Sequence, residues 1–181
     1  MKKIIVGSLV GGLLIFIWQT LSWTALDLHR SAQNYTPKQD SILAYLNTQF
    51  SETGSYFLPN LPAGASGEEQ NKLMENSMNK PWVQIHYHKA QTMNMGLNIA
   101  RGFIVDIFMV SLLCWIISQF KSNSFFTTFF ATILTGFIAY INVPYTNHIW
   151  YEWADIRMYL LDTAVSWSLC GIWLGWWMNR K

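Results

Sequence analysis

Two aspartates stand inside long apolar stretches of this sequence, and each follows an arginine by five residues. The pairs are Arg101 with Asp106 and Arg157 with Asp162. A charged side chain near the middle of a membrane-spanning helix costs about 2.5–3.5 kcal/mol on insertion scales, so each carboxylate should face a cation or a cavity. Five residues turn a helix by about 140°, so the two members of one pair point in different directions.

Crossed pairs between the two helices are an alternative arrangement. If both helices run in the same direction, their arginines and aspartates lie at similar depths, so Arg101 could pair with Asp162 and Asp106 with Arg157. This intramembrane polar cluster could be a proton, ion or substrate site, or an ion-pair clamp that holds two helices together. We favour the clamp, because structural ion pairs account for many buried charges.

Four other residues could bind a metal ion. His86 and His88 alternate along an expected strand, so both imidazoles lie on one face and could reach one metal. His148 and Glu152 are four apart and would be neighbours on a helix. Nearby methionine thioethers would suit copper(I) better than zinc. We favour a simpler interpretation, in which these polar groups cap the outer end of the bundle and no cofactor is bound, because His-x-His is common by chance.

The composition is that of a membrane protein. Half of the residues (51%) are hydrophobic and only 12% are charged, against about 25% charged in ordinary soluble domains. Ten Trp, eight Tyr and eleven Phe suit a chain anchored at lipid–water interfaces. The net charge of +2 and the lack of a basic patch argue against nucleic-acid binding. The sequence contains no nucleophile elbow, phosphate loop, zinc-protease helix or dinucleotide fingerprint.

The apolar stretches are long enough to cross a bilayer. A hydrocarbon core about 30 Å thick needs roughly 20 mainly apolar residues in a helix, and four segments satisfy this: 4–26, 102–120, 125–143 and 158–178. Gly7 and Gly11 in the first, and Gly171 and Gly175 in the fourth, have the spacing that lets helix backbones approach closely. The sequence therefore predicts an all-α membrane protein, a four-transmembrane-helix bundle whose first helix is an uncleaved anchor.

Acidic residues are absent from one side of these four segments. With the N-terminus in the cytoplasm, the cytoplasmic stretches contain only basic charges: Lys2, Lys3, Lys121, Arg180 and Lys181. The positive-inside rule predicts this distribution, and the opposite orientation would violate it. We therefore expect a multi-pass protein of the bacterial inner (cytoplasmic) membrane with both ends in the cytoplasm.

Residues 27–100 are long enough for a small α+β extracytoplasmic loop domain between the first two spans. The expected elements are a helix over 37–50, a strand at 56–58, a polar helix ending near 79 and a strand over 82–88. Two capping boxes, Thr36 with Gln39 and Ser66 with Glu69, predict where the helices begin.

The predicted organisation has three parts: 1–26, 27–100 and 101–181. The last part holds the second, third and fourth transmembrane helices. Pro144 should interrupt the third of the four helices, because proline lacks a backbone N–H and restricts the residue before it. A short outer loop at 143–157 should then lead into the fourth helix.

The chain from about 102 to 181 resembles an uncharacterised family of small four-helix bacterial membrane proteins. The resemblance rests on Asn142-Val-Pro-Tyr145, on His148-Ile-Trp-Tyr-Glu152, and on the closing helix from Leu161-Asp162 to Trp176-Trp177. The loop between the first two spans is much longer here than in that family. The resemblance implies the four-helix topology and brings no catalytic residues, because the family has no assigned activity.

These observations favour a polytopic inner-membrane protein that is an accessory or scaffolding component rather than an enzyme. One alternative is a small transporter or proton-coupled carrier that uses Asp106 and Asp162. Another is a metal-binding accessory protein that holds copper or zinc. The expected partners are the lipid bilayer and other membrane proteins or a homo-oligomer, and nucleic acid is not among them.

Overall fold

The computed structural model describes residues 1–180, which are mostly helical and fold into two compact units. A helical unit combines 1–34 with 94–180, and an inserted unit comprises Tyr35–Met93. Most contacts of each unit are made within that unit.

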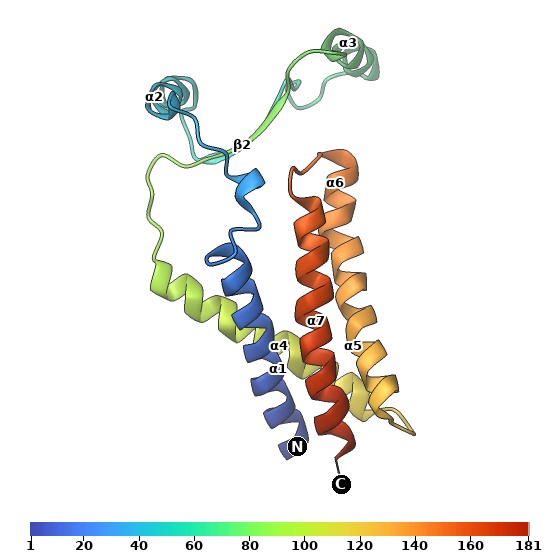
Figure 1. Ribbon diagram of the computed structural model, residues 1–181. Helices are drawn as coiled ribbons and strands as arrows, with labels where there is room; N and C mark the ends of the chain where they lie inside the picture. The colour runs from blue at the N-terminus through green and yellow to red at the C-terminus, as the bar shows by residue number, and fades with distance from the viewer. Residues whose placement is uncertain (181) are drawn as a thin grey trace. The chain divides into compact units, whose positions relative to one another are not determined.

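The helical unit contains four long helical stretches and three short helical turns. Its elements are α1 (Lys2–Trp23), η1 (Arg30–Ala32), α4 (Met95–Ser118), α5 (Phe125–Tyr140), η2 (Ile141–Tyr145), α6 (Thr146–Trp150) and α7 (Ile156–Asn179). The N-terminus and the last turn of α7 lie at the same end of this unit (Figure 1). The chain therefore runs along the unit four times, and α4 and α7 share a direction, as expected from the sequence.

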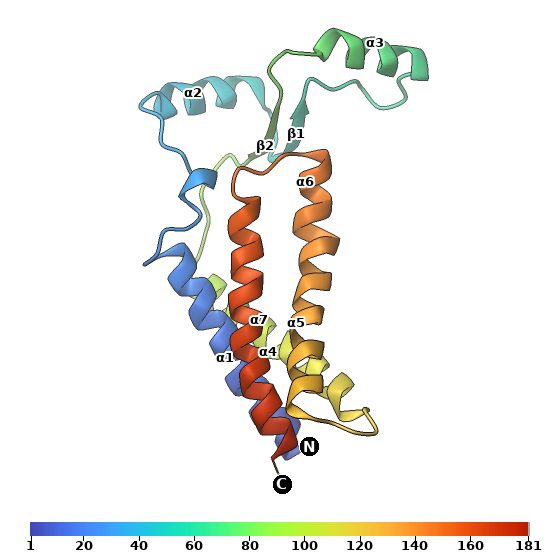
Figure 2. The ribbon, with the colours of Figure 1, turned by 45° about the vertical axis from the view of Figure 1, so that its right-hand side comes forward.

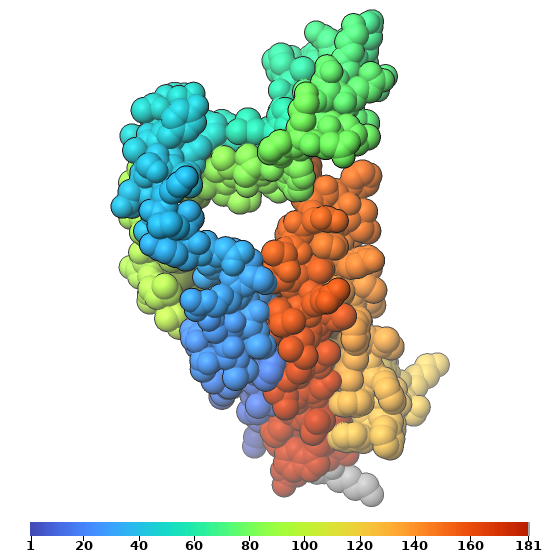
Figure 3. All heavy atoms as spheres, turned by 45° about the horizontal axis from the view of Figure 1, so that its top comes forward, coloured from blue at the N-terminus to red at the C-terminus, as the bar shows by residue number. Residues whose placement is uncertain are grey.

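α1 and α7 are the two inner helices of this unit. α1 lies against both α4 and α7, and α7 also packs against α5. The space-filling view shows α1 and α7 in direct contact (Figure 3). The buried core is formed by eight side chains: Ile15, Val110, Leu113, Cys114, Ile117, Trp167, Cys170 and Leu174. Because the core lies where α1, α4 and α7 meet, it fixes the relative positions of these three helices.

Glycines permit the close approach of these helices. A Cβ atom added at Gly11 would lie 3.0 Å from Sγ of Cys170, and one added at Gly175 would lie 3.0 Å from the backbone oxygen of Phe125. Such distances are shorter than ordinary van der Waals contact. The prediction that the small-residue pairs serve helix packing is confirmed.

The outward faces of the long helices are apolar. On α1 the exposed stripe consists of Ile5, Leu9, Leu13, Ile17 and Leu21, and on α4 it includes Ile104, Phe108, Leu112 and Trp115. Three helical stretches are long and apolar enough to cross a membrane: Lys2–Trp23, Met95–Ser118 and Phe125–Trp150. The fourth expected span, α7, is a helix of 24 residues but is not among these three.

Pro144 does not interrupt the third long helix, so that prediction is wrong. The chain widens into the π-helical turn η2, which contains Pro144, and continues as α6 to Trp150. A π-turn bonds residues five apart, and the backbone N–H of Thr146 accordingly reaches the oxygen of Ile141. The Thr146 hydroxyl donates to the same oxygen at 2.8 Å. The non-helical connection is therefore limited to residues 151–155 rather than 143–157.

The inserted unit consists of a two-stranded antiparallel sheet and two helices, one at each end of the sheet (Figure 2). Its elements are α2 (Gln39–Gln49), β1 (Gly54–Leu58), α3 (Gly67–Ser77) and β2 (Val83–Tyr87). The strands pair antiparallel, with Ser55 opposite His86. The end of α2 is fixed to the hairpin because the Tyr87 hydroxyl donates to Asn47 at 2.8 Å and Phe50 stacks on Tyr56. The expected helices and strands of this segment are confirmed.

Only one of the two expected capping boxes forms. The Ser66 hydroxyl accepts from the backbone N–H of Glu69, and the Glu69 carboxylate accepts from the N–H of Ser66. These bonds lower the pKa of Glu69, because they favour its charged form. At the start of α2 the prediction is wrong, because the cap residue is Lys38 and its side chain makes no cap bond.

Candidate functional site

A sharp turn after α1 places a histidine beside α7. The helix ends with backbone bonds from Ala25 and Leu26 to Leu21, and the chain then reverses through Asp27, whose φ is +50°. Aspartate tolerates this left-handed conformation better than most residues. The N–H of Leu28 donates to the oxygen of Ser22 at 3.0 Å. The turn therefore folds residue 29 back along the end of α1.

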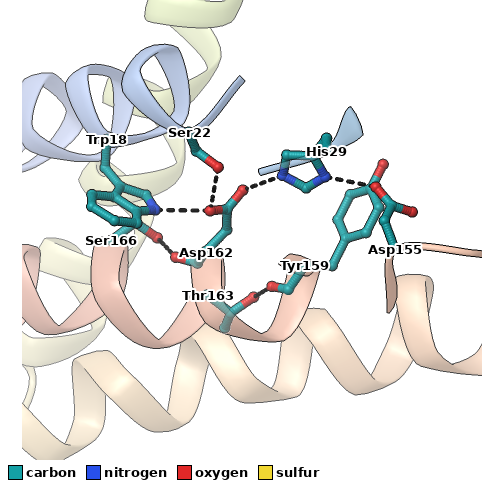
Figure 4. Close-up of polar contacts among 8 residues, drawn as sticks. All are labelled: Trp18, Ser22, His29, Asp155, Tyr159, Asp162, Thr163 and Ser166. Carbon is teal, nitrogen blue, oxygen red and sulfur yellow. Dashed lines mark hydrogen bonds and ion pairs between the residues drawn. The ribbon is translucent and has the colours of Figure 1, made fainter. Parts of the chain in front are cut away.

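His29 joins two carboxylates of α7 and its cap. Its Nδ1 lies 2.6 Å from Oδ2 of Asp155, and its Nε2 lies 2.8 Å from Oδ2 of Asp162. His29 is 3% exposed and Asp155 is 4% exposed. Figure 4 shows the imidazole between the two carboxylates, with both ring nitrogens engaged. We refer to His29, Asp155 and Asp162 as the His29 cluster.

Asp162 connects this cluster to α1. Its second oxygen, Oδ1, accepts from the indole N–H of Trp18 at 2.9 Å and from the hydroxyl of Ser22 at 2.6 Å. Trp18 and Ser22 are four residues apart and so lie on the same face of α1. The Asp162 carboxylate thus accepts three side-chain hydrogen bonds, and two of them come from the helix that packs against it.

Asp155 occupies the N-cap position of α7 without capping it through its side chain. Aspartate is favoured at this position because its side chain can accept from the first backbone N–H groups of a helix. Here the carboxylate binds His29 instead, although the helix N-terminus still favours a negative charge nearby. A group that could have capped the helix is used for a tertiary contact.

Two aromatic rings enclose the imidazole. Trp23 stacks on His29 with 4.0 Å between ring centroids and 6° between planes, and Tyr159 meets it edge-on at 5.1 Å. A protonated imidazole over an indole face gains cation–π attraction. The rings therefore shield the cluster from water on two sides and favour the charged form.

The bonding pattern favours the imidazolium form of His29. An ionised carboxylate only accepts hydrogen bonds, so two ring nitrogens that both contact ionised carboxylates must both donate, and only the imidazolium does so. Burial alone would lower the pKa of His29, but the hydrogen bonds and attraction from Asp155 and Asp162 outweigh it and the pKa is raised. The cluster is a cation held between two anions.

No family model, curated protein or solved structure matches this chain.

The crossed arginine–aspartate pairs expected from the sequence do not form. Within residues 1–180, the ion pairs of the helical unit are those of the His29 cluster and an exposed pair of Arg30 with Asp27. Arg101 and Arg157 are exposed. The physical reason is that the turn after α1 places a cation closer to Asp162 than either arginine.

Asp106 lies apart from that cluster, on the buried face of α4. It is 4% exposed and one turn from the core residue Val110. Within the described chain, its Oδ2 is a buried polar atom without a hydrogen-bond partner. A buried polar group without a partner is destabilising, and a charged one more so.

Replacing Asp106 with leucine should therefore stabilise the helical unit. We expect Asp106→Leu to raise the free energy of unfolding by about 1–3 kcal/mol, because the change removes an unpaired polar atom from the buried face of α4. Unfolding in detergent, followed by circular dichroism, measures this. Asp106→Asn, which keeps a polar group, should gain less. A loss of stability in Asp106→Leu would show that the carboxyl group has a partner.

The residues expected to bind metal are divided between the two units. His86 lies on β2, where its Nδ1 is 2.8 Å from the Ser55 hydroxyl, and His88 follows that strand. His148 lies in α6 and accepts from the N–H of Trp153 at 2.9 Å, and Glu152 is exposed. Residues 1–180 contain no group of three or more His, Cys, Asp or Glu side chains arranged to hold a metal ion.

The sequence does not single out His29, which falls in the expected extracytoplasmic loop. It places Asp155 one turn beyond His148 and Glu152, as a further candidate for the metal site, and not as a partner of His29. A usable signal was present, because Asp155 and Asp162 are seven apart and share one face of a helix. On α1, Trp18 and Ser22 share a face in the same way. Two polar faces near the ends of apolar helices predict a buried contact between them.

Proposed function

We propose that this chain is a multi-pass protein of the bacterial inner membrane and that α7 is its fourth transmembrane helix. The support comes from α7 itself. Beyond Arg157 in its first turn, its exposed side chains are apolar: Leu160, Leu161, Leu169, Ile172 and Trp176. Its polar groups Asp162 and Ser166 are bonded within the unit, since Trp18 donates to Asp162 and Ser166 to the backbone of Asp162. A helix with this distribution suits lipid on one side and protein on the other.

The proposed orientation places both ends in the cytoplasm. The positive-inside rule supports it, because the stretches at that end are basic and hold no acidic residue. The connection at residues 151–155 and the inserted unit are then extracytoplasmic. Trp176 and Trp177 would lie at the cytoplasmic interface, where indole rings are favoured.

The function that we propose is that of a non-enzymatic accessory or scaffolding component. One observation carries it. The group best suited to acid–base chemistry, His29, has both ring nitrogens bonded to carboxylates, so it offers no free nitrogen to a substrate. The inserted unit, joined to α1 and α4 at its two ends, is the part that would contact partners.

The inserted unit offers an apolar surface for such contacts. An open groove is lined by Leu58, Pro59, Leu73, Trp82 and Val83, among others. Met74 on α3 is 69% exposed, and Met78, which directly follows α3, is 68% exposed. Exposed apolar patches on small domains are common at protein–protein contacts.

Site-specific photocrosslinking tests the scaffolding proposal. A photoreactive phenylalanine analogue at Met74 should give adducts to one or a few discrete proteins, either another membrane protein or a second copy of this chain. The matched control is the same analogue at Ile172, on the outward face of α7, which should react with lipid. A monodisperse monomer in mild detergent, with no protein adduct from Met74, would contradict the proposal.

A second candidate function is that of a proton-coupled carrier, and Asp106 is the observation that favours it. A buried carboxyl group without a partner can bind and release a proton. In liposomes that contain a pH-sensitive dye, the wild-type protein should then dissipate a proton gradient and Asp106→Asn should not. Equal rates for both proteins and for empty liposomes would exclude this function.

A further inference from the structure

The connector that follows α1, residues 24–34, is held against α7 by the His29 cluster, and the scaffolding role does not explain this contact. We propose that the His29 cluster is a proton-binding site that acts as a latch. With a proton on each ring nitrogen of His29, the connector is tied to α7, and loss of one proton releases it. The ligand is a single proton, and no other molecule is needed.

Proton binding and closure of the latch are coupled by the bonding pattern. The two ring nitrogens lie 2.6 and 2.8 Å from carboxylate oxygens of Asp155 and Asp162. A neutral imidazole donates from one nitrogen only and presents a lone pair at the other. That lone pair would face a carboxylate oxygen, which also has lone pairs, so one of the two contacts becomes repulsive. Deprotonated His29 therefore cannot hold both aspartates.

The ionisable side chains that face His29 from α7 and its cap are the two aspartates of the cluster, Asp155 and Asp162, and Tyr159. The side chains of α1 that surround the cluster, Trp18, Ser22 and Trp23, carry no charge.

The other charged side chains on the connector and on α7 do not hold the connector against α7. On the connector, Asp27 and Arg30 bind each other at 2.7 Å and are 51% and 78% exposed. Arg157 is exposed on α7. The protonation of His29 itself therefore controls the contact with α7.

The direction of the pH effect follows from the raised pKa of His29. A group whose pKa is higher in the folded protein contributes stability that is fully present below its unfolded pKa, about 6.5 for histidine. That contribution is lost as the pH rises through the folded value. The latch is therefore closed below about pH 6.5 and opens as the pH rises through the higher pKa of His29 in the folded protein.

The compartment that supplies the proton to His29 depends on the membrane orientation given with the proposed function. His29 lies past the last residue of α1, at the end of the helical unit opposite the N-terminus (Figures 1 and 4). In the proposed orientation this end faces the extracytoplasmic compartment, and the connector leads into the inserted unit. The site itself is independent of the orientation.

Nitrogen NMR of the histidine side chains tests proton binding directly. The protein contains four histidines, so the spectrum of the ¹⁵N-histidine-labelled protein in detergent is simple. The signals of His29 are those that disappear in His29→Gln, and His86→Gln is the matched control. Should His29→Gln fail to fold, single Gln variants of the other three histidines assign His29 by elimination.

The expected result is that both nitrogens of His29 carry a proton at pH 6 and that the ring titrates above the value of free histidine. Titration at or below the value of free histidine would overturn the proposal. Neither result depends on membrane orientation or on partners, so failure of the latch and failure of the scaffolding role can be told apart.

Hydrogen exchange tests the release of the connector. Its amides donate within the turn, from Leu28 to Ser22 and from Ala32 to His29, both at 3.0 Å. At pH 6 these amides should exchange about tenfold more slowly in the wild-type protein than in His29→Gln, the factor expected for one hydrogen bond between charged groups. The ratio of the two rates should fall toward one as the pH rises. Because both proteins are compared at the same pH, the intrinsic pH dependence of exchange cancels. A ratio that stays constant across the titration of His29 would overturn the latch.

Discussion

Replacing Gly12 with alanine is expected to lower the free energy of unfolding by about 1–3 kcal/mol, and replacing it with leucine by about 3 kcal/mol. A Cβ atom at Gly12 would lie 2.7 Å from both the backbone nitrogen and the Cα of Ile107. A backbone cannot rotate away as a flexible side chain can, so α1 and α4 must separate. Unfolding of the purified protein in detergent, followed by circular dichroism, measures the loss.

Gly102 provides the matched control for this prediction. It also lies in the interface of α1 with α4, but the nearest atom to an added Cβ, on Phe16, is 3.8 Å away, which is ordinary contact. Gly102→Ala should therefore be neutral or stabilise by up to about 1 kcal/mol, since alanine favours the helix over glycine. Equal losses in Gly12→Ala and Gly102→Ala would mean that close packing at Gly12 is not what holds the two helices together.

Replacing Asp162 with alanine is expected to destabilise the helical unit by about 3–5 kcal/mol. The change removes the acceptor of three hydrogen bonds, from Trp18, Ser22 and His29. The donors that remain are buried or half-buried and lose their partner, and His29 keeps only one of its two carboxylates. The free energy of unfolding at pH 6, where His29 is protonated, is the quantity to measure.

The matched control for Asp162→Ala is Glu152→Ala, which removes an exposed acidic side chain shortly before α7. Its effect should stay within about 0.5 kcal/mol, as is usual for exposed positions. At high pH the loss in Asp162→Ala should shrink, because the wild-type protein no longer has the imidazolium. A loss that is the same at pH 6 and above the pKa of His29 would contradict the role of the charged histidine.

The long helices were predictable because their signal is local. Each of the first three spans is an apolar run of the length that a helix needs, and the structure places α1, α4 and α5 over these runs. The end of the third was not predicted. The rule that proline ends a helix assumes regular α-helical bonds, and the π-turn around Pro144 removes that assumption. Local composition does not reveal such a turn.

The polar site was predictable only in part. The apolar surroundings of Asp162 marked it as a residue that needs a partner, and the structure gives it three. The identity of the partner depended on the reversal of the chain at Asp27, which brings His29 back to α7. A tertiary contact between residues 133 positions apart leaves no periodic trace in the sequence, so the arginines appeared to be the better partners.

Cysteine labelling on either side of α7 tests whether four helices cross the membrane. Single cysteines at Ser122, Ala154 and Arg180 would be probed in intact cells with a membrane-impermeant maleimide. The two native cysteines, Cys114 and Cys170, are buried and give the background. If α7 crosses the membrane, Ala154→Cys should be labelled in intact cells, and Ser122→Cys and Arg180→Cys should be labelled only after permeabilisation. Labelling of Arg180→Cys in intact cells, on the same side as Ala154→Cys, would show that α7 does not cross the membrane.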